Sequence, residues 1–158
     1  MRTRDTTGGS EAGFTMTELL VVILIVGLLA AIAVPMLIRQ QDRGHDATAK
    51  DTAGNVARAM AIFRQQNDDS YACGTSGECL DSVRDIEDSL PGDGIVIGRA
   101  GGLPGDATAT GYRVTVTGGG GRTFWIEHTS AGSTRGCNLN GATSPGGCSA
   151  PVAGAGSW

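Results

Sequence analysis

One carboxylate lies within a long apolar stretch near the start of the sequence. Glu18 is the only ionisable side chain among the 25 residues from Phe14 to Ile38, and residues 19–34 are apolar or small without a break. A charge at the centre of a membrane-spanning helix costs about 2.5–3.5 kcal/mol, somewhat less near an edge, and is tolerated mainly where it has a partner. Glu18 is therefore a candidate functional carboxylate.

The apolar segment itself allows three interpretations on composition alone. As a helix its 25 residues extend about 37 Å, which exceeds the roughly 30 Å hydrocarbon core of a bilayer. A cleaved secretory signal is one interpretation, because Ala31-Ile32-Ala33 is a small-x-small site and Arg2 and Arg4 give a weakly positive start. An ordinary membrane anchor is the second, and a spanning segment with a functional Glu18 is the third.

A specific motif favours the third interpretation. The sequence reads Gly13-Phe14-Thr15-Met16-Thr17-Glu18-Leu19-Leu20 and continues through Gly27, Ala30-Ala31-Ile32-Ala33 and Pro35. This pattern resembles the class III signal of type IV pilins and pseudopilins. The resemblance implies cleavage between Gly13 and Phe14 by a prepilin peptidase, N-methylation of Phe14, and an assembly role for Glu18. It departs from short type IVa leaders, because Glu11-Ala12 precede the cut in place of Lys or Arg.

The chemistry of the motif has a physical basis. Glycine before the scissile bond lets the backbone enter a protease cleft in extended form. Cleavage creates an amine at the membrane edge, and this cation and Glu18 neutralise one another if the amine of one subunit meets the carboxylate of the next. Pairing within one chain is the alternative, because Glu18 lies one helical turn from Phe14.

Four cysteines form two pairs that are close in sequence. The resemblance implies that everything after Ile38 lies outside the cytosol, where disulfides are expected. Sequence proximity favours Cys73 with Cys79 and Cys137 with Cys148, without establishing this connectivity. A zinc site is the alternative, although the spacings are wider than is usual for zinc.

An amphipathic helix follows the apolar segment. Small and apolar residues step by 4, 3, 4 and 3 positions along one face up to about Gln66: Ala49, Ala53, Val56, Met60 and Phe63. Gly27 and Pro35 are expected to weaken the helix before this stripe. The polar run Asn67-Asp68-Asp69-Ser70 is expected to end it, with calcium binding as a less favoured alternative.

The remaining sequence is rich in glycine and changes to a strand pattern. We expect a short helix capped by Asp81, a strand at Ile95-Val96-Ile97, and a hairpin across the four glycines 118–121. The inner face of the hairpin is expected to carry four apolar residues: Val114, Val116, Phe124 and Ile126. Trp125 then faces the other side, where it either covers the adjoining loops or binds a sugar or a partner.

Nothing in the sequence indicates an enzyme. His45 and His128 are the only histidines, and neither accompanies a nucleophile motif, so both are expected at the surface. The glycine tetrad lacks the lysine of a phosphate loop. We expect no catalytic residue, no cofactor and no metal site. The net charge of −4, with 18% charged residues, also argues against direct nucleic-acid binding.

Together these features predict an α+β protein in which a long N-terminal helix packs on a small antiparallel sheet, as in pilins. We expect a cleaved leader (1–13), a transmembrane and assembly helix (14–38), its amphipathic continuation (39–66), and a glycine-rich loop and sheet region with a C-terminal loop (67–158). A chain of 158 residues is typical of a single domain, which agrees with this organisation.

The resemblance implies a structural subunit of a type IV pilus-like filament. Its expected partners are further copies of itself, a prepilin peptidase, the membrane, and an assembly machinery with a platform protein and an ATPase. The precursor is expected in the cytoplasmic membrane and the assembled subunit at the cell surface. A pseudopilin of type II secretion or DNA uptake is the alternative within this class, and a secreted or anchored monomeric binding domain is the alternative outside it.

Overall fold

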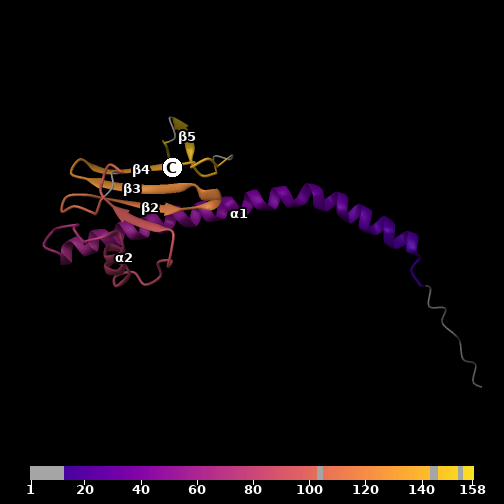
Figure 1. The fold of residues 1–158 in the computed structure, drawn as a ribbon, viewed down its shortest axis with the longest axis horizontal. Helices are drawn as coiled ribbons and strands as arrows, with labels where there is room; N and C mark the ends of the chain where they lie inside the picture. Colours follow the sequence, from indigo (N-terminus) through magenta and orange to yellow (C-terminus); the bar gives the residue numbers. More distant parts are fainter. Residues whose placement is uncertain (1–12, 103–104, 143–145, 153–154) are drawn as a thin grey trace, which may run out of the picture. The chain divides into compact units, whose positions relative to one another are not determined.

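The computed structural model describes residues 13–102, 105–142, 146–152 and 155–158. Contacts divide the chain into two units, Met1–Ile38 and Arg39–Trp158. The expected leader, 1–13, lies outside the described residues except for Gly13. Figure 1 follows the chain by colour from the N-terminus to the C-terminus.

The described residues form two α-helices, one short 3-10 turn and six strands. The helices are α1 (Met16–Gln66) and α2 (Ser76–Arg84), and the 3-10 turn is η1 (Gly119–Gly121). The strands are β1 (Ile95–Gly98), β2 (Tyr112–Thr117), β3 (Thr123–Thr129), β4 (Gly132–Asn138), β5 (Ser149–Val152) and β6 (Ala155–Ser157). They form one antiparallel sheet in the order β1-β2-β3-β4-β6-β5. The predicted α+β class, with a long N-terminal helix and a small antiparallel sheet, is confirmed.

The second unit has a core between the buried face of α1 and one face of the sheet. Ala49, Ala53, Val56 and Met60 of the predicted stripe are buried, and Phe63 at its end is half-buried. Small residues on the helix let the sheet approach closely, and the larger side chains of the strands fill the space between them. Figure 1 shows β2 and β3 running alongside this part of α1.

The hairpin of β2 and β3 has the predicted inner face, and its connection includes Arg122 as well as the four glycines, because Thr117 pairs with Thr123. Val114 lies opposite Ile126 and Val116 lies opposite Phe124, and all four side chains are buried. The glycine run 118–121 makes the connection through η1, with positive φ at Gly120 and Gly121. Such φ values favour glycine at these two positions.

The short helix differs from the prediction in its start. Asp81 was expected to cap it, but α2 begins at Ser76 and its N-cap is Thr75. The Thr75 hydroxyl accepts from the Glu78 amide at 3.4 Å, while Glu78 Oε2 accepts from the Thr75 amide at 2.7 Å. This capping box satisfies two amide groups that the helix leaves without partners, so it outcompetes the later start at Asp81, which lies inside α2.

Helix α1 ends where the polar run predicted it. Its last residue is Gln66, and the Asp69 amide donates back to the Arg64 carbonyl at 3.0 Å. The carboxylate of Asp69 pairs with the Arg64 guanidinium at 2.9 Å. Asp69 therefore contributes to the helix end, with both its amide and its carboxylate engaged.

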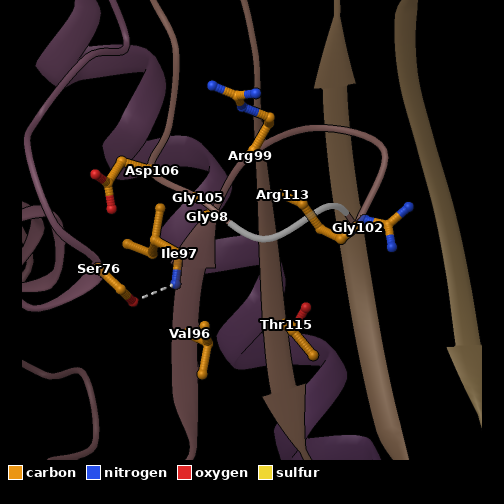
Figure 2. A pocket seen from close by; sticks show the side chains of 10 residues that line it. All are labelled: Ser76, Val96, Ile97, Gly98, Arg99, Gly102, Gly105, Asp106, Arg113 and Thr115. Carbon is orange, nitrogen blue, oxygen red and sulfur yellow. Dashed lines mark hydrogen bonds between the residues drawn. The ribbon is translucent and has the colours of Figure 1, made fainter.

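The edge strand β1 is covered on its open side. The Ile97 amide donates to Ser76 Oγ at 3.0 Å, and the Arg99 amide donates to the Gly105 carbonyl at 2.9 Å. Figure 2 shows the Ser76 contact at the edge of a hollow of about 370 Å³. These two contacts occupy outward-facing donors that an added strand would otherwise use.

Candidate functional site

The apolar segment of α1 is uncovered in a single chain. Every large apolar side chain from Leu19 to Ile38 is between 50% and 73% exposed. The described residues include one helix that is long and apolar enough to cross a membrane, Met16–Gln66, and its most apolar window is 0% buried; a signal sequence would satisfy the same criterion. An apolar surface of this size is unfavourable in water, so lipid or protein must cover it.

Glu18 is engaged by its own chain at the start of α1. Its Oε2 accepts from the Thr15 amide at 3.2 Å and from the Thr15 hydroxyl at 3.1 Å, while the Glu18 amide donates to Thr15 Oγ1 at 3.2 Å. This reciprocal arrangement is a second capping box. The spacing of Thr15 and Glu18 is the signal that could have indicated it from the sequence. Within its own chain, the Glu18 carboxylate therefore contacts Thr15.

The predicted cleavage position lies just ahead of this box. Gly13 and Phe14 precede the first helical residue, Met16, and have no regular secondary structure. Phe14 is 84% exposed, and a Cβ added to Gly13 would meet no atom within 4 Å. The peptide bond between them is thus exposed and irregular, as a protease substrate must be.

Gly27 and Pro35 both lie inside α1. Pro35 cannot donate a backbone hydrogen bond, and glycine costs about 1 kcal/mol relative to alanine in a helix interior. A Cβ added to Gly27 would meet nothing within 4 Å, so packing within one chain does not require glycine there. Helix weakening at these two positions stays a prediction.

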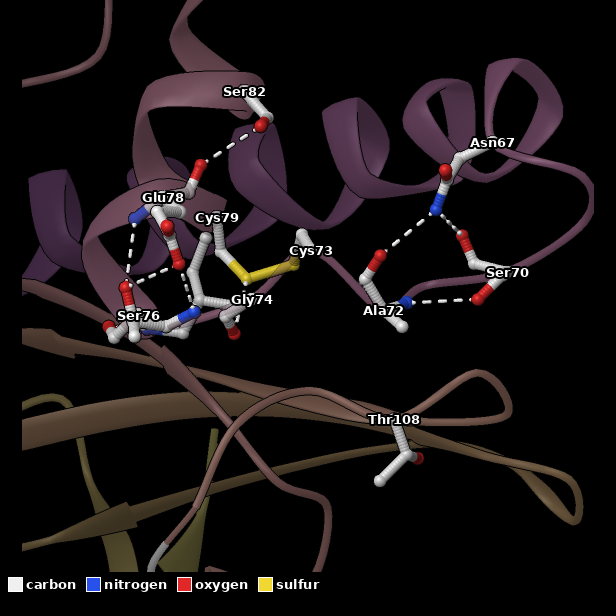
Figure 3. The surroundings of a disulfide bond; sticks show 12 residues. Asn67, Ser70, Ala72, Cys73, Gly74, Ser76, Glu78, Cys79, Ser82 and Thr108 are labelled. Atoms are coloured by element: carbon white, nitrogen blue, oxygen red, sulfur yellow. Dashed lines mark hydrogen bonds between the residues drawn. A yellow bond between two sulfur atoms is a disulfide. The ribbon is translucent and has the colours of Figure 1, made fainter.

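The cysteines are paired as sequence proximity favours. Cys73 bonds Cys79, and Cys137 bonds Cys148. Figure 3 shows the first bond beside the start of α2, where it ties the chain that leaves α1 to this helix. The second ties β4 to the chain just before β5. These bonds use all four cysteines of the sequence.

A buried ion pair links α1 to the turn between β2 and β3. Asp46 and Arg122 are each 1% exposed, and Arg122 Nε donates to Asp46 Oδ2 at 2.8 Å and to Oδ1 at 3.1 Å. The Gly119 amide donates to Asp46 Oδ1 at 3.0 Å, and the Gly147 amide to Oδ2 at 3.1 Å. Sequence reasoning missed this pair, because nothing local distinguishes Asp46 from the exposed acids.

Lys50 fixes the segment before β5 to the same helix. Its Nζ donates to the Gly147 carbonyl at 2.6 Å and lies 5.1 Å from the centre of the Phe124 ring and 5.7 Å from that of Trp158. Both backbone groups of Gly147 therefore bond side chains of α1, the carbonyl to Lys50 and the amide to Asp46. The segment that the Cys137–Cys148 bond closes is therefore also held by polar contacts.

The aromatic and histidine candidates have ordinary structural surroundings. Trp125 is half-buried on the outer face of the sheet, where the Arg113 guanidinium lies 4.3 Å from its ring centre. A Cβ on Gly136 would come within 2.0 Å of the Trp125 ring, so the indole lies against that strand. His45 is exposed, and His128 is half-buried with Nδ1 2.9 Å from Ser133 Oγ.

The hollow beside β1 brings polar groups together without completing a site. Figure 2 shows Arg99 and Asp106 from the loop after β1, with Arg113 from β2. Arg113 forms an ion pair with Glu127, because its NH2 lies 2.5 Å from Glu127 Oε2. The described residues contain no group of three histidine, cysteine, aspartate or glutamate side chains that could hold a metal ion.

Comparison with known proteins places the functional signal at the N-terminus. Residues 9–34 match the family model of the prokaryotic N-terminal methylation motif. The chain is 33% identical over 57 residues to the type II secretion system core protein G of Pseudomonas aeruginosa. The aligned region covers 36% of this chain and 40% of that protein.

Two further relatives carry pilin names. Identity is 46% over 54 residues to the type IV narrow pilus major component PilA5 of Thermus thermophilus, or 34% of this chain and 47% of that protein. Identity is 39% over 56 residues to the type IV major pilin protein PilA of Myxococcus xanthus, and this alignment covers 35% of this chain and 26% of that protein. The chain thus matches less than half the length of each relative. No solved structure matches it significantly.

These likenesses define the class of the N-terminal segment. It carries the prokaryotic N-terminal methylation motif and resembles the corresponding segment of type IV pilins and of a type II secretion core protein. The predicted resemblance of the N-terminal segment to type IV pilins and pseudopilins is confirmed.

Proposed function

We propose that this protein is a structural subunit of a type IV pilus-like filament. A prepilin peptidase removes residues 1–13, and the mature chain polymerises through its apolar helix. The observation that carries the proposal is the combination of the methylation motif with an apolar helix that its own chain leaves uncovered. A filament interior built from such helices would cover that surface.

The proposal assigns a sequence of environments to the apolar segment. Before assembly, lipid of the cytoplasmic membrane covers residues 14–38, and Phe14 receives its methyl group after cleavage. During assembly the same residues pass from lipid into contact with other subunits. The amine of Phe14 on one subunit then meets Glu18 of another, so that neither charge is left alone in an apolar environment.

The partners follow from this route. Besides the peptidase and further copies of the chain, assembly needs a platform protein in the membrane and an ATPase that supplies the energy. The assembled subunit lies at the cell surface. We assign no enzymatic role to the subunit; the relatives are named as a secretion-system core protein, a pilus component and a pilin.

The experiment that tests the proposal is intact mass measurement combined with N-terminal sequencing of the mature protein. We expect a chain of 158 − 13 = 145 residues that starts at Phe14 with one additional methyl group. A mature chain that starts at Val34 would instead indicate ordinary secretion and would overturn the proposal. Changing Gly13 to leucine should leave full-length precursor in the membrane.

A pseudopilin is the second candidate, and the similarity to core protein G favours it. Electron microscopy of surface material separates the two. Long filaments that carry this protein identify a pilin, whereas short fibres retained within the cell envelope identify a pseudopilin. A correctly processed protein that stays monomeric under all conditions would favour an anchored binding domain.

A further inference from the structure

A groove lies between α1 and the β3–β4 side of the sheet. Its volume is about 400 Å³, and its walls include Gly54, Ala57 and Ala61 of α1. Because these residues are small, the helix surface is recessed here. The opposite wall comes from β3 and β4.

The floor of the groove is aromatic. Tyr112 is 3% exposed and stacks on His128, with ring centres 5.8 Å apart and planes 19° apart. The Tyr112 hydroxyl donates to the Ala57 carbonyl at 3.3 Å, and burial raises the pKa of this phenol above its ordinary value. Tyr112 is therefore neutral at physiological pH, and the permanent charges of the groove lie on its rims.

Both charged rims of the groove are basic. Arg58 and Arg135 are exposed and line it from α1 and β4. Arg58 contacts the Asn55 side chain, and Arg135 lies 5.2 Å from the centre of the Trp158 ring. Among the described residues neither guanidinium has a carboxylate within 4.0 Å, whereas Arg64 and Arg113 each have one and Arg122 has two.

The complementary charge lies on another part of the same unit. The turn that follows α2, residues 85–89, contains Asp85 and Asp88, which are both exposed. No cation pairs with either carboxylate within the described part of the chain. Helix α2 packs on β1, the edge strand, while the groove lies at β3 and β4, so the two features occupy different places along the sheet.

We propose that the groove binds the acidic turn of a second copy, with Arg58 and Arg135 of one subunit paired to Asp85 and Asp88 of the next. Short aspartate side chains fit a recess made by glycine and alanine, and guanidinium–carboxylate pairs give directional hydrogen bonds. Because the two surfaces differ, the contact is heterologous, and such contacts generate open filaments when the rotation does not close. This inference rests on the proposed function and names a contact outside the apolar helix.

Charge reversal in the full-length protein tests the contact. The double variant Arg58→Glu with Arg135→Glu should be cleaved after Gly13 normally but should form at least about tenfold fewer filaments, because it places like charges together. Combining it with Asp85→Arg and Asp88→Arg should restore filaments. The matched control is Arg99→Glu, which reverses an exposed charge outside the groove and should leave the filament number unchanged.

Cross-linking tests proximity and keeps all four charges of the proposed contact, because the cysteine is placed at the neighbouring Ser89 of the acidic turn. Ala61→Cys in one copy and Ser89→Cys in another, expressed together, should give a disulfide-linked dimer in filaments. Thr117→Cys, exposed at the opposite end of β2 from Tyr112, should give none with Ser89→Cys.

The possible results separate this inference from the proposed function. Normal filaments from the Arg58/Arg135 reversal, or no dimer from the Ala61/Ser89 pair in intact filaments, would overturn the groove contact and leave the proposed function standing. Loss of filaments without rescue by the charge swap and without a dimer would mean that the groove receives a different, non-self anion. Wild-type chains that are not cleaved after Gly13 would overturn the proposed function itself.

Discussion

At the residue level, Glu18 has two competing roles. It completes a capping box with Thr15 in its own chain, and in the proposed filament it pairs with the amine of another subunit. Glutamine can replace glutamate in a capping box but carries no charge. Substitution by glutamine therefore separates the two roles.

We predict that Glu18→Gln and Glu18→Ala are both cleaved after Gly13 and both form few or no filaments. The uncompensated amine would cost several kcal/mol when it enters an apolar bundle. Intact mass reports the cleavage, and electron microscopy reports the filaments. The matched control, Thr15→Val, removes the cap but keeps the charge, and it should assemble. Normal filament numbers from Glu18→Gln would assign this side chain to the cap instead.

A second residue-level prediction concerns Asp46 and Arg122. Asp46→Ala removes the buried carboxylate that accepts from Arg122 Nε and leaves the guanidinium only the more exposed Asp42, so it should lower the free energy of unfolding by about 3–5 kcal/mol. Arg122→Met should cost a similar amount, and the double variant should lose less than the two single losses added together. Urea unfolding of the detergent-solubilised mature protein measures all three.

Asp42→Ala is the control for this ion pair. Its carboxylate lies 3.8 Å from Arg122 NH2 and is 36% exposed, so water screens the interaction. We expect a loss below about 1 kcal/mol. Additive losses at Asp46 and Arg122 would show that the two side chains act independently.

At the level of elements, the turn between β2 and β3 depends on close approach to α1. A Cβ on Gly119 would lie 2.6 Å from the Asp42 carbonyl oxygen, which is backbone and cannot rotate away. Gly121 has φ of +80° but open space around it. Glycine thus suits the two positions for different reasons: close approach at Gly119 and backbone conformation at Gly121.

We predict that Gly119→Ala lowers the free energy of unfolding by about 1–3 kcal/mol, because the turn must move away from the helix. Gly121→Asn should be nearly neutral, because asparagine tolerates a left-handed conformation. Thermal unfolding of the two variants measures the difference. Equal losses would mean that backbone conformation, not proximity to α1, decides the turn.

The capping box of α2 gives a pH prediction. Hydrogen bonds from the Thr75 amide and hydroxyl lower the pKa of Glu78 from its ordinary value of 4.5. The folded state thus favours the charged carboxylate, so its contribution is present above about pH 4.5 and is lost as pH falls through the lower folded pKa. Wild type should be more stable than Glu78→Gln at pH 7, and this difference should shrink below pH 4. A difference that stays constant down to pH 2 would contradict this.

At the level of the whole molecule, the two disulfides support a small core. They close short loops with sequence separations of 6 and 11 residues. Closing loops of this size stabilises by about 2–3 kcal/mol each in the chain-entropy model. The second bond also holds Gly147 near Asp46 and Lys50, so its loss should release contacts far from it in sequence.

We predict that the native mature chain has no titratable thiol and that reduction lowers its thermal midpoint. Reduction followed by denaturation should then expose four thiols. The Cys137→Ser/Cys148→Ser variant should lose more stability than the entropic figure for its own loop, since the polar contacts of Gly147 depend on it. Four free thiols in untreated protein would contradict the disulfide assignment.

Much of this protein was readable from its sequence because the signals are local. The apolar run, the stripe on α1 and the alternation in β2 and β3 each repeat over a few residues, so periodicity alone assigns their structure and buried face. The motif around Gly13 and Glu18 is likewise contiguous. The same logic extends to the start of α2, where the spacing of Thr75 and Glu78 was present but was overlooked.

Only the tertiary structure decided the contacts between distant segments. Asp46 and Arg122 are 76 residues apart, and whether such charges are buried together depends on how the sheet lies over α1. Strands β4, β5 and β6 lack a strong apolar alternation, so pairing with neighbouring strands rather than local preference defines them. The groove beside Arg58 exists for the same reason: sequence specifies its side chains, but only packing brings a recessed helix surface, an aromatic floor and two basic rims together.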